Sequence, residues 1–258
     1  MELVLTIATI LVALPYVLGP VLLWMNGSHL PPTRMEQAGG DAKLPPAVES
    51  HLWKTTAFFS SNGFEMLGAR VRESASNGFS SYKQAWRNPE TAEVALAGAF
   101  LKADDASFCN TFVAFLHDRA NGAMVMTSNF NAGARTLLDP PGSSKISVDN
   151  QDLAELRAIH QGHLAVVGSE TVRPVRFRDG FALCKQLDDA TRQRAVDTKR
   201  FRATGDTLRI TLWGAIFGIW INLPPLKWQY EREEKQLLEK ALAASARGGM
   251  LRSASRAA

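Results

Sequence analysis

The run EVALAGAFLKADDASFCNTFVAFLHDRANGAMVMTSN, residues 93–129, decides the fold. It contains three largely apolar segments, at residues 93–101, 107–116 and 123–129, that are typical of strands. Asp104-Asp105 separates the first two segments, and Asn121-Gly122 separates the last two. Asn-Gly between apolar runs is a strong hairpin signal, and strands joined by short turns are antiparallel. The run therefore predicts three consecutive antiparallel strands.

Two more strands are expected before this run, at residues 64–72 and 82–87, because turn signals bound each of them. Helices are expected at residues 47–61, after Asp149, and at residues 180–199. Asp149 is the expected N-cap of the second helix, with Asp152 three residues later as in a capping box. The fold class is therefore α+β, with an antiparallel meander of about five strands packed with helices.

The composition excludes several classes of protein. The chain has 258 residues, a formal net charge of +4 and 46% hydrophobic residues. These values exclude a wholly disordered chain, a collagen-like repeat and a disulfide-dense scaffold. A mean hydropathy of -0.09 excludes a polytopic channel or transporter, although one or two membrane segments remain compatible with it.

Residues 3–25 carry no charge and predict an N-terminal transmembrane anchor. A helix of this length reaches about 35 Å, enough to cross a hydrocarbon core of about 30 Å. A cleaved signal peptide is the rival interpretation, but it needs a basic start and a small-residue cleavage site. Residues 1–2 are Met-Glu, and residues 24–27 make a poor cleavage site. The expected membrane-facing residues are Leu3, Leu11, Leu18, Leu22 and Trp24.

Residues 210–226 form a second uncharged segment and predict another membrane contact. Its length is at the lower limit for a spanning helix, so three interpretations stay open: interfacial or re-entrant, spanning, or buried in a soluble core. Tryptophan and basic side chains both favour the headgroup region. The expected contact residues are Trp213, Phe217, Trp220 and Trp228, and the membrane-proximal cations are Lys199, Arg200, Arg202, Arg209 and Lys227.

Five regions follow from these patterns. They are an anchor at 1–25, a Pro/Gly-rich linker at 26–46, a soluble α+β domain at 47–204, a membrane-contact segment at 205–228, and a charged helical tail at 229–258 that becomes disordered from residue 243. Basic residues flank the membrane segments on the domain side, whereas none precedes the anchor. The positive-inside rule therefore favours an inner or plasma membrane with a cytoplasmic domain, and an extracytoplasmic domain is the alternative.

The chain has no Walker loop, dinucleotide fingerprint, zinc-protease motif or Cys-x-x-Cys. His160 and His163 lie three apart on an expected helix, so both could reach a metal with a third ligand from His117, Asp118 or Cys109. The favoured alternative is that His163 packs on the apolar face of the helix and His160 lies at the border of that face. We therefore assign no metal, no cofactor and no catalytic residue.

Cys109 has two possible roles besides burial. It could be a thiol nucleophile beside His117, or it could form a disulfide with Cys184 in an oxidising compartment. The polar cluster of Thr127, Ser128, Asn129 and Asn131 ends the last strand and could bind a ligand, although such residues more often shape a turn.

These features favour a membrane-anchored, non-enzymatic accessory or assembly subunit of a membrane protein complex. Its expected partners are membrane lipids and other membrane proteins, not nucleic acid. One alternative is a membrane-tethered domain that binds a small molecule or lipid in an apolar pocket. The expected pocket residues are Phe100, Phe112, Phe115 and Met126. The second alternative is a thiol-dependent enzyme that uses Cys109.

Overall fold

A computed structural model describes residues 2–27, 29–30, 32–38, 44–68, 70–74, 79–102, 105–118, 124–130, 142–149, 152–168 and 179–256. The chain divides into two compact units. Unit 1 comprises Met1–Pro32, Arg135–Asp139 and Asp189–Glu233. Unit 2 comprises Thr33–Ala134, Pro140–Asp188 and Glu234–Ala258. The expected domain at 47–204 does not coincide with either unit, because residues 189–204 belong to unit 1 and residues 234–258 belong to unit 2.

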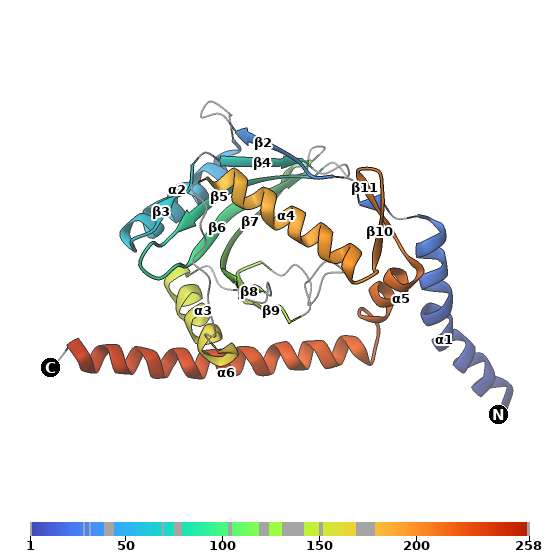
Figure 1. The fold of residues 1–258 in the computed structure, drawn as a ribbon. Coiled ribbons are helices and arrows are strands. Elements are labelled where there is room, and N and C mark those ends of the chain that lie inside the picture. Colours follow the sequence, from blue (N-terminus) through green and yellow to red (C-terminus); the bar gives the residue numbers. More distant parts are fainter. Residues whose placement is uncertain are drawn as a thin grey trace. The chain divides into compact units, whose positions relative to one another are not determined.

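Unit 2 is built on an eight-stranded sheet in which β2, β4, β5, β6, β7, β8 and β9 follow one another, and β3 pairs with β5 (Figure 1). The strands are β2 (Arg34–Ala38), β3 (Glu65–Met66), β4 (Arg70–Ser74), β5 (Phe79–Arg87), β6 (Val94–Lys102), β7 (Asp105–Asp118), β8 (Met124–Ser128) and β9 (Ser144–Ser147). The pairs from β4 to β8 are all antiparallel. The α+β class is therefore confirmed, and five consecutive strands form an antiparallel meander.

Two strands of this sheet differ from the expectation. β2 lies inside the expected linker at 26–46, where the frequent prolines and glycines obscure a short segment that has neither. Its Met35 packs on the core, and its Glu36 forms an ion pair with Arg72 on β4 at 3.0 Å. β9 pairs with β8 in parallel. The connection at 129–143 permits this direction, since a parallel neighbour needs a crossover of a dozen residues or more.

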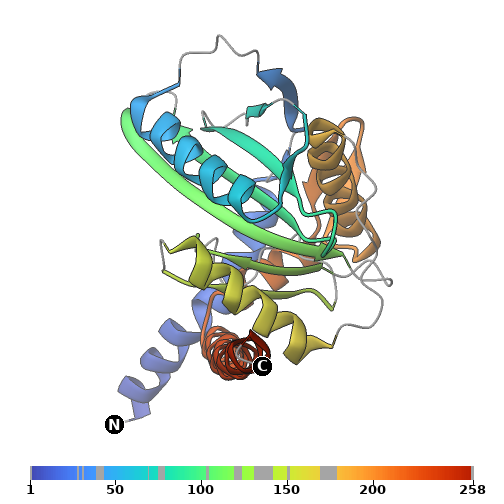
Figure 2. The ribbon, with the colours of Figure 1, turned by 90° about the vertical axis from the view of Figure 1, so that its left-hand side faces the viewer.

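The sheet is covered on both faces. Helix α2 (Pro46–Ser61) covers one face of the sheet (Figure 2). Its Val48, Leu52 and Phe59 meet Ala95 and Phe115 there. The first half of α4 (Gly180–Asp197) packs on the other face, where Leu183 and Cys184 meet Leu96 and Phe112. Successive side chains of a strand point to opposite faces, so β6 must be apolar along most of its length.

Helix α3 (Leu153–Val167) packs on β7 and β8, and it lies beside the second half of α6 (Leu226–Arg256) (Figure 2). Asp152 is its N-cap, because its carboxylate accepts from the N–H groups of Ala154 and Glu155 at 2.8 and 3.1 Å. The expected N-cap, Asp149, lies three residues too early. The helix α6 also continues past residue 243, where disorder was expected.

Unit 1 combines helices with a small three-stranded sheet. Its strands are β1 (His29–Leu30), β10 (Phe201–Thr204) and β11 (Thr207–Ile210), and its helices are α1 (Glu2–Met25), α5 (Leu212–Trp220) and the parts of α4 and α6 at 189–197 and 226–233. α1 and α5 pack together at Gly19, which faces Ile219. The indole Nε1 of Trp220 donates to the carbonyl oxygen of Tyr16 at 2.9 Å.

None of the helices in the described part of the chain is both long and apolar enough to cross a membrane, so these residues do not support the expected transmembrane anchor. The side chains of α1 are described from Ala13 onward, so those of Leu3 and Leu11 lie outside the described set. The segment at 210–226 is not one helix, because α5 has nine residues and reaches about 14 Å.

The contact between α3 and α6 yields a prediction. A Cβ on Gly162 would overlap the backbone carbonyl of Ala241. We expect Gly162→Ala to lower the free energy of unfolding by about 1–3 kcal/mol, because the overlap outweighs the better helix propensity of alanine. Chemical unfolding followed by circular dichroism measures the change. Gln161→Ala on the same helix is the control, and equal stability of both variants would contradict this packing.

Candidate functional site

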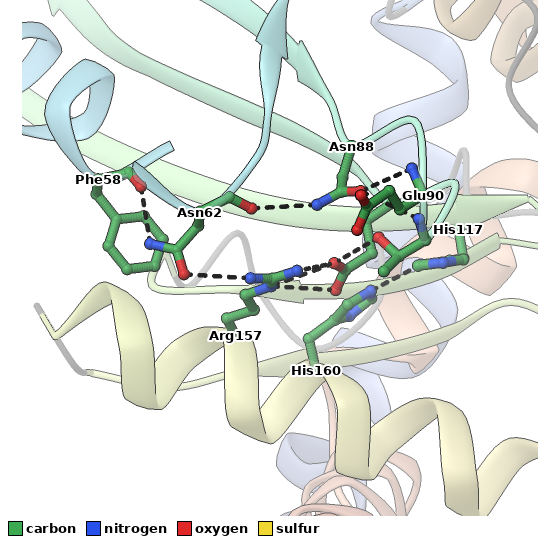
Figure 3. A network of polar contacts seen from close by, with 9 residues as sticks. Phe58, Asn62, Asn88, Glu90, His117, Arg157 and His160 are labelled. Atoms are coloured by element: carbon green, nitrogen blue, oxygen red, sulfur yellow. Dashed lines mark hydrogen bonds and ion pairs between the residues drawn. The ribbon is translucent and has the colours of Figure 1, made fainter. Parts of the chain in front are cut away.

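A continuous chain of side-chain hydrogen bonds crosses the interior of unit 2 between α3 and strands β7, β8 and β9. The Nδ1 atom of His117 lies 2.9 Å from Nε2 of His160. Figure 3 shows the two rings facing each other. Nδ1 of His160 lies 3.0 Å from Oγ1 of Thr127, which lies 3.0 Å from Nδ1 of His163. Nε2 of His163 lies 2.7 Å from Oγ of Ser144. We call these five residues the histidine chain.

The histidine chain has a closed end and a more open end. Thr127, His160 and His163 are fully buried, and His117 is 4% exposed. Ser144 is only partly buried and is the first residue of β9, an outer strand of the sheet. Buried polar atoms are costly unless they are hydrogen-bonded, so this arrangement pairs side chains that could not otherwise be buried.

When the three rings are neutral, the carbonyl of Thr91 fixes the direction of the hydrogen bonds in the histidine chain. A backbone hydrogen bond to Thr91 raises the pKa of His117, so His117 donates to this carbonyl. The Nδ1 atom of the neutral His117 ring must then accept from Nε2–H of His160. A neutral imidazole has one donor and one acceptor nitrogen, so Nδ1 of His160 then accepts from the hydroxyl of Thr127. The oxygen of that hydroxyl in turn accepts from Nδ1–H of His163. When the His163 ring is neutral, the hydroxyl of Ser144 is the donor to its Nε2 atom.

The surroundings keep the inner rings neutral. Burial lowers the pKa of His117, although the charge of Glu93 and the Thr91 carbonyl partly offset it. Burial also holds the pKa of His160 well below its usual value, and His117, His163 and Arg157 add to that effect. Neutral rings fit the single direction of donation, because an added proton would place two donors against each other.

A buried ion pair lies next to the His117 end of the histidine chain (Figure 3). Nε of Arg157, on α3, donates to Oε2 of Glu93 at 3.1 Å, and Glu93 is 2% exposed. Nη1 of Arg157 reaches Oδ1 of Asn62 at 3.3 Å, and the hydroxyl of Thr91 donates to Oε2 of Glu93 at 2.9 Å. These bonds hold the segment that carries the Thr91 carbonyl in place.

The structure brings His160 and His163 together on Thr127, as their helical spacing indicates. The rings of His117 and His160 bond directly to each other. Within the described residues, no group of three His, Cys, Asp or Glu side chains is arranged to hold a metal ion. The side chain of Asp118, the other possible ligand, lies outside the described set.

The cysteines take no part in this site. Cys109 and Cys184 are both free thiols. Burial raises the pKa of Cys109 and raises that of Cys184 to about 11, which disfavours the nucleophilic thiolate. Cys109 and His117 lie eight residues apart on β7, about 26 Å along a strand, so they do not form a pair.

The expected pocket residues lie on both faces of the sheet. Phe100 and Phe112 stack at 4.8 Å between ring centroids, and Met126 packs in the same cluster. Phe115 lies in the cluster under α2. It follows Phe112 by three residues on β7, and side chains an odd number of residues apart on a strand point to opposite faces of the sheet.

The polar cluster at the end of β8 mostly bonds to backbone. Oδ1 of Asn129 accepts from N–H of Val113 at 2.6 Å, and the hydroxyl of Ser128 donates to the carbonyl of Phe130 at 3.0 Å. Asn131 lies outside the described residues. Thr127 alone of the described members of this cluster belongs to the histidine chain.

A second candidate site is the apolar surface of unit 1. Its members are the exposed residues Leu14, Val17, Leu18, Leu22, Trp24 and Met25 of α1, Leu212, Trp213 and Trp220 of α5, and Trp228 of α6. Phe217 is half-buried, and the guanidinium of Arg200 lies 3.9 Å from its ring centroid. We call these residues, with Phe217, the tryptophan surface.

The expected membrane-proximal cations all belong to unit 1. Lys199 is exposed, and Arg202 lies opposite Arg209 across the β10–β11 pair. The guanidinium of Arg209 lies near Gly27, just after α1 ends. Lys227 forms an exposed ion pair with Glu231 at 3.8 Å.

Sequence reasoning missed Ser144, Glu93 and Arg157 as parts of the site. Arg157, His160 and His163 share one side of α3 at a spacing of three residues, which could have indicated a polar stripe facing the sheet. Ser144 has no comparable signal, since its position depends on the parallel pairing of β9.

Comparison with protein-family models, with curated proteins and with solved structures gives no match. The candidate roles therefore depend on the geometry of the two sites.

The buried histidines predict a loss of stability in acid. The pKa values of His51, His117 and His160 are lowered by burial, so the unfolded chain binds protons more readily than the folded chain. The free energy of unfolding should fall as the pH drops below about 6.5, by up to about 1.4 kcal/mol per pH unit for each such histidine. Urea unfolding between pH 7.5 and 5 measures the slope.

His160→Gln should flatten this slope, while His29→Gln, which removes an exposed histidine, should leave it unchanged. The same slope in His160→Gln and in the wild type would contradict the assignment.

Proposed function

We propose that this chain is a membrane-attached accessory subunit that assembles with other membrane proteins, and that unit 1 makes the attachment. The tryptophan surface supports the proposal most directly. Among the described residues, ten of the fourteen exposed large hydrophobic side chains belong to unit 1. Large exposed apolar patches mark contact sites for proteins or membranes.

The chemistry of the surface favours a lipid bilayer as its occupant. Trp213, Trp220 and Trp228 are 57%, 42% and 63% exposed, and indole rings are favoured where headgroups meet hydrocarbon. The neighbouring cations suit anionic lipid headgroups, which attract each membrane-proximal Lys or Arg by about 1 kcal/mol. A surface that combines both features fits an anionic bilayer better than it fits another protein core.

The two helices would then share one location. Since none of the described helices is long and apolar enough to cross a membrane, we propose that α1 and α5 both lie in the interface, with their apolar side chains at the edge of the hydrocarbon. With neither helix crossing the bilayer, all the basic residues named above lie on one side of it, and we propose the cytoplasmic side, whose leaflet carries anionic lipids.

Vesicle flotation tests the attachment. The purified chain, freed of detergent, should float with vesicles that contain an anionic lipid, and less with neutral vesicles. The triple substitution of Trp213, Trp220 and Trp228 by Ser should reduce the floated fraction several-fold, because it removes the interfacial rings. Trp53→Ser is the control, since Trp53 is 73% exposed but belongs to unit 2. Equal flotation of the triple variant and the control would contradict the proposed surface.

Purification in mild detergent tests the assembly. A tagged chain from its native membrane should retain a stoichiometric set of membrane proteins, identified by mass spectrometry. A chain that purifies alone and monodisperse would overturn the subunit role, even if it floats with vesicles.

A further inference from the structure

We propose that Ser144 is a reactive nucleophile that His163 activates, and that unit 2 can transfer or hydrolyse the acyl group of a small ester. This inference goes beyond membrane attachment and does not depend on it. Nucleophilic serines are recognised by a base within hydrogen-bond reach that is itself oriented by a third group. Ser144, His163 and Thr127 meet this description.

The base lies in the correct position and tautomer. Oγ of Ser144 lies 2.7 Å from Nε2 of His163, within the range of a general base. In the neutral His163 ring, whose Nδ1–H is directed at Thr127, Nε2 is the acceptor and the serine proton is directed at it. His163 is fully buried and cannot turn toward water instead.

Thr127 is the positioning residue. Its hydroxyl oxygen accepts from Nδ1–H of His163 at 3.0 Å and so holds the ring in the tautomer that can take a proton from Ser144. In the Ser-His-Asp arrangement a carboxylate has this position and also stabilises the imidazolium. A neutral hydroxyl orients the ring without that charge, so we expect a slow nucleophile.

The backbone near Ser144 is fixed and partly accessible. The hydroxyl oxygen of Ser143 accepts from N–H of Met124 at 3.2 Å, so this neighbour has a structural role. Gly142 is exposed and has φ +78°, a conformation that glycine adopts without strain. The two adjacent serines therefore differ, since only Ser144 bonds to a histidine among the described contacts.

The reaction balances with water alone. Oγ of Ser144 attacks the ester carbonyl carbon while its proton moves to Nε2 of His163. The bond from carbon to the leaving oxygen breaks, and His163 gives that oxygen the proton, so the alcohol leaves and acyl-Ser144 remains. Water then attacks the acyl carbon and gives a proton to His163, which returns it to Oγ of Ser144 as the carboxylic acid leaves.

Labelling with a fluorophosphonate tests the proposal on the full chain in detergent. Intact mass and peptide mapping should find one adduct on Ser144. The chain should also cleave p-nitrophenyl acetate, and the variants that lose labelling should lose this cleavage as well. His163→Gln should slow the labelling roughly 100-fold, because it removes the base. Ser144→Ala should abolish the adduct, while Ser143→Ala should still be labelled. No adduct, or equal rates in wild type and His163→Gln, would overturn the proposal.

The Thr127 variants separate positioning from folding. Thr127→Ser keeps the hydroxyl and should retain most of the labelling rate, whereas Thr127→Val keeps the shape and should lose it. Circular dichroism shows whether each variant is folded. Equal rates in two folded Thr127 variants would remove Thr127 from the mechanism. Ser144→Ala should still float with vesicles, so failure of this proposal is distinguishable from failure of membrane attachment.

Discussion

Three imidazole rings inside a folded unit impose a strict requirement, because each has two nitrogens that must pair without water. Unit 2 meets this requirement by placing β7, β8 and β9 against α3. Each ring then has a hydrogen-bond partner on an element other than its own. When the rings are neutral, a single backbone carbonyl, that of Thr91, determines which nitrogen of each ring carries the hydrogen. The Arg157–Glu93 ion pair holds this carbonyl, and so couples the surface of α3 to the interior of the sheet.

Most of the fold could be predicted from local signals. The apolar run at 93–129 and its Asn-Gly turn indicate the meander, and the helix after Pro45-Pro46 follows from ordinary periodicity and start signals. β2 was not predicted because the strand signal of five residues is weaker than the loop signal of the prolines and glycines around them. β9 was not predicted because its parallel pairing with β8 depends on packing between segments far apart in the sequence, and no turn residue indicates it.

The candidate site was less predictable than the fold. Helical spacing shows that His160 and His163 point the same way, but it does not reveal that Thr127 lies between them. His163 was expected on the apolar face and His160 at its border, and that placement suggested ordinary core residues. Their hydrogen bonds to β7, β8 and β9 depend on strand register, which a single sequence does not contain. The two uncharged segments indicated seven of the eleven residues of the tryptophan surface, but not Leu14, Val17, Met25 and Leu212.

One contact at the end of the sheet has a wider consequence. The outward N–H of Ser147 on β9 donates to Oε1 of Glu234, on α6, at 3.2 Å. Outer strands are templates on which other chains can add strands and start aggregates. A strand from a neighbouring molecule would first have to displace this carboxylate and the helix that carries it. Glu234 therefore protects the β9 edge of the sheet from self-association.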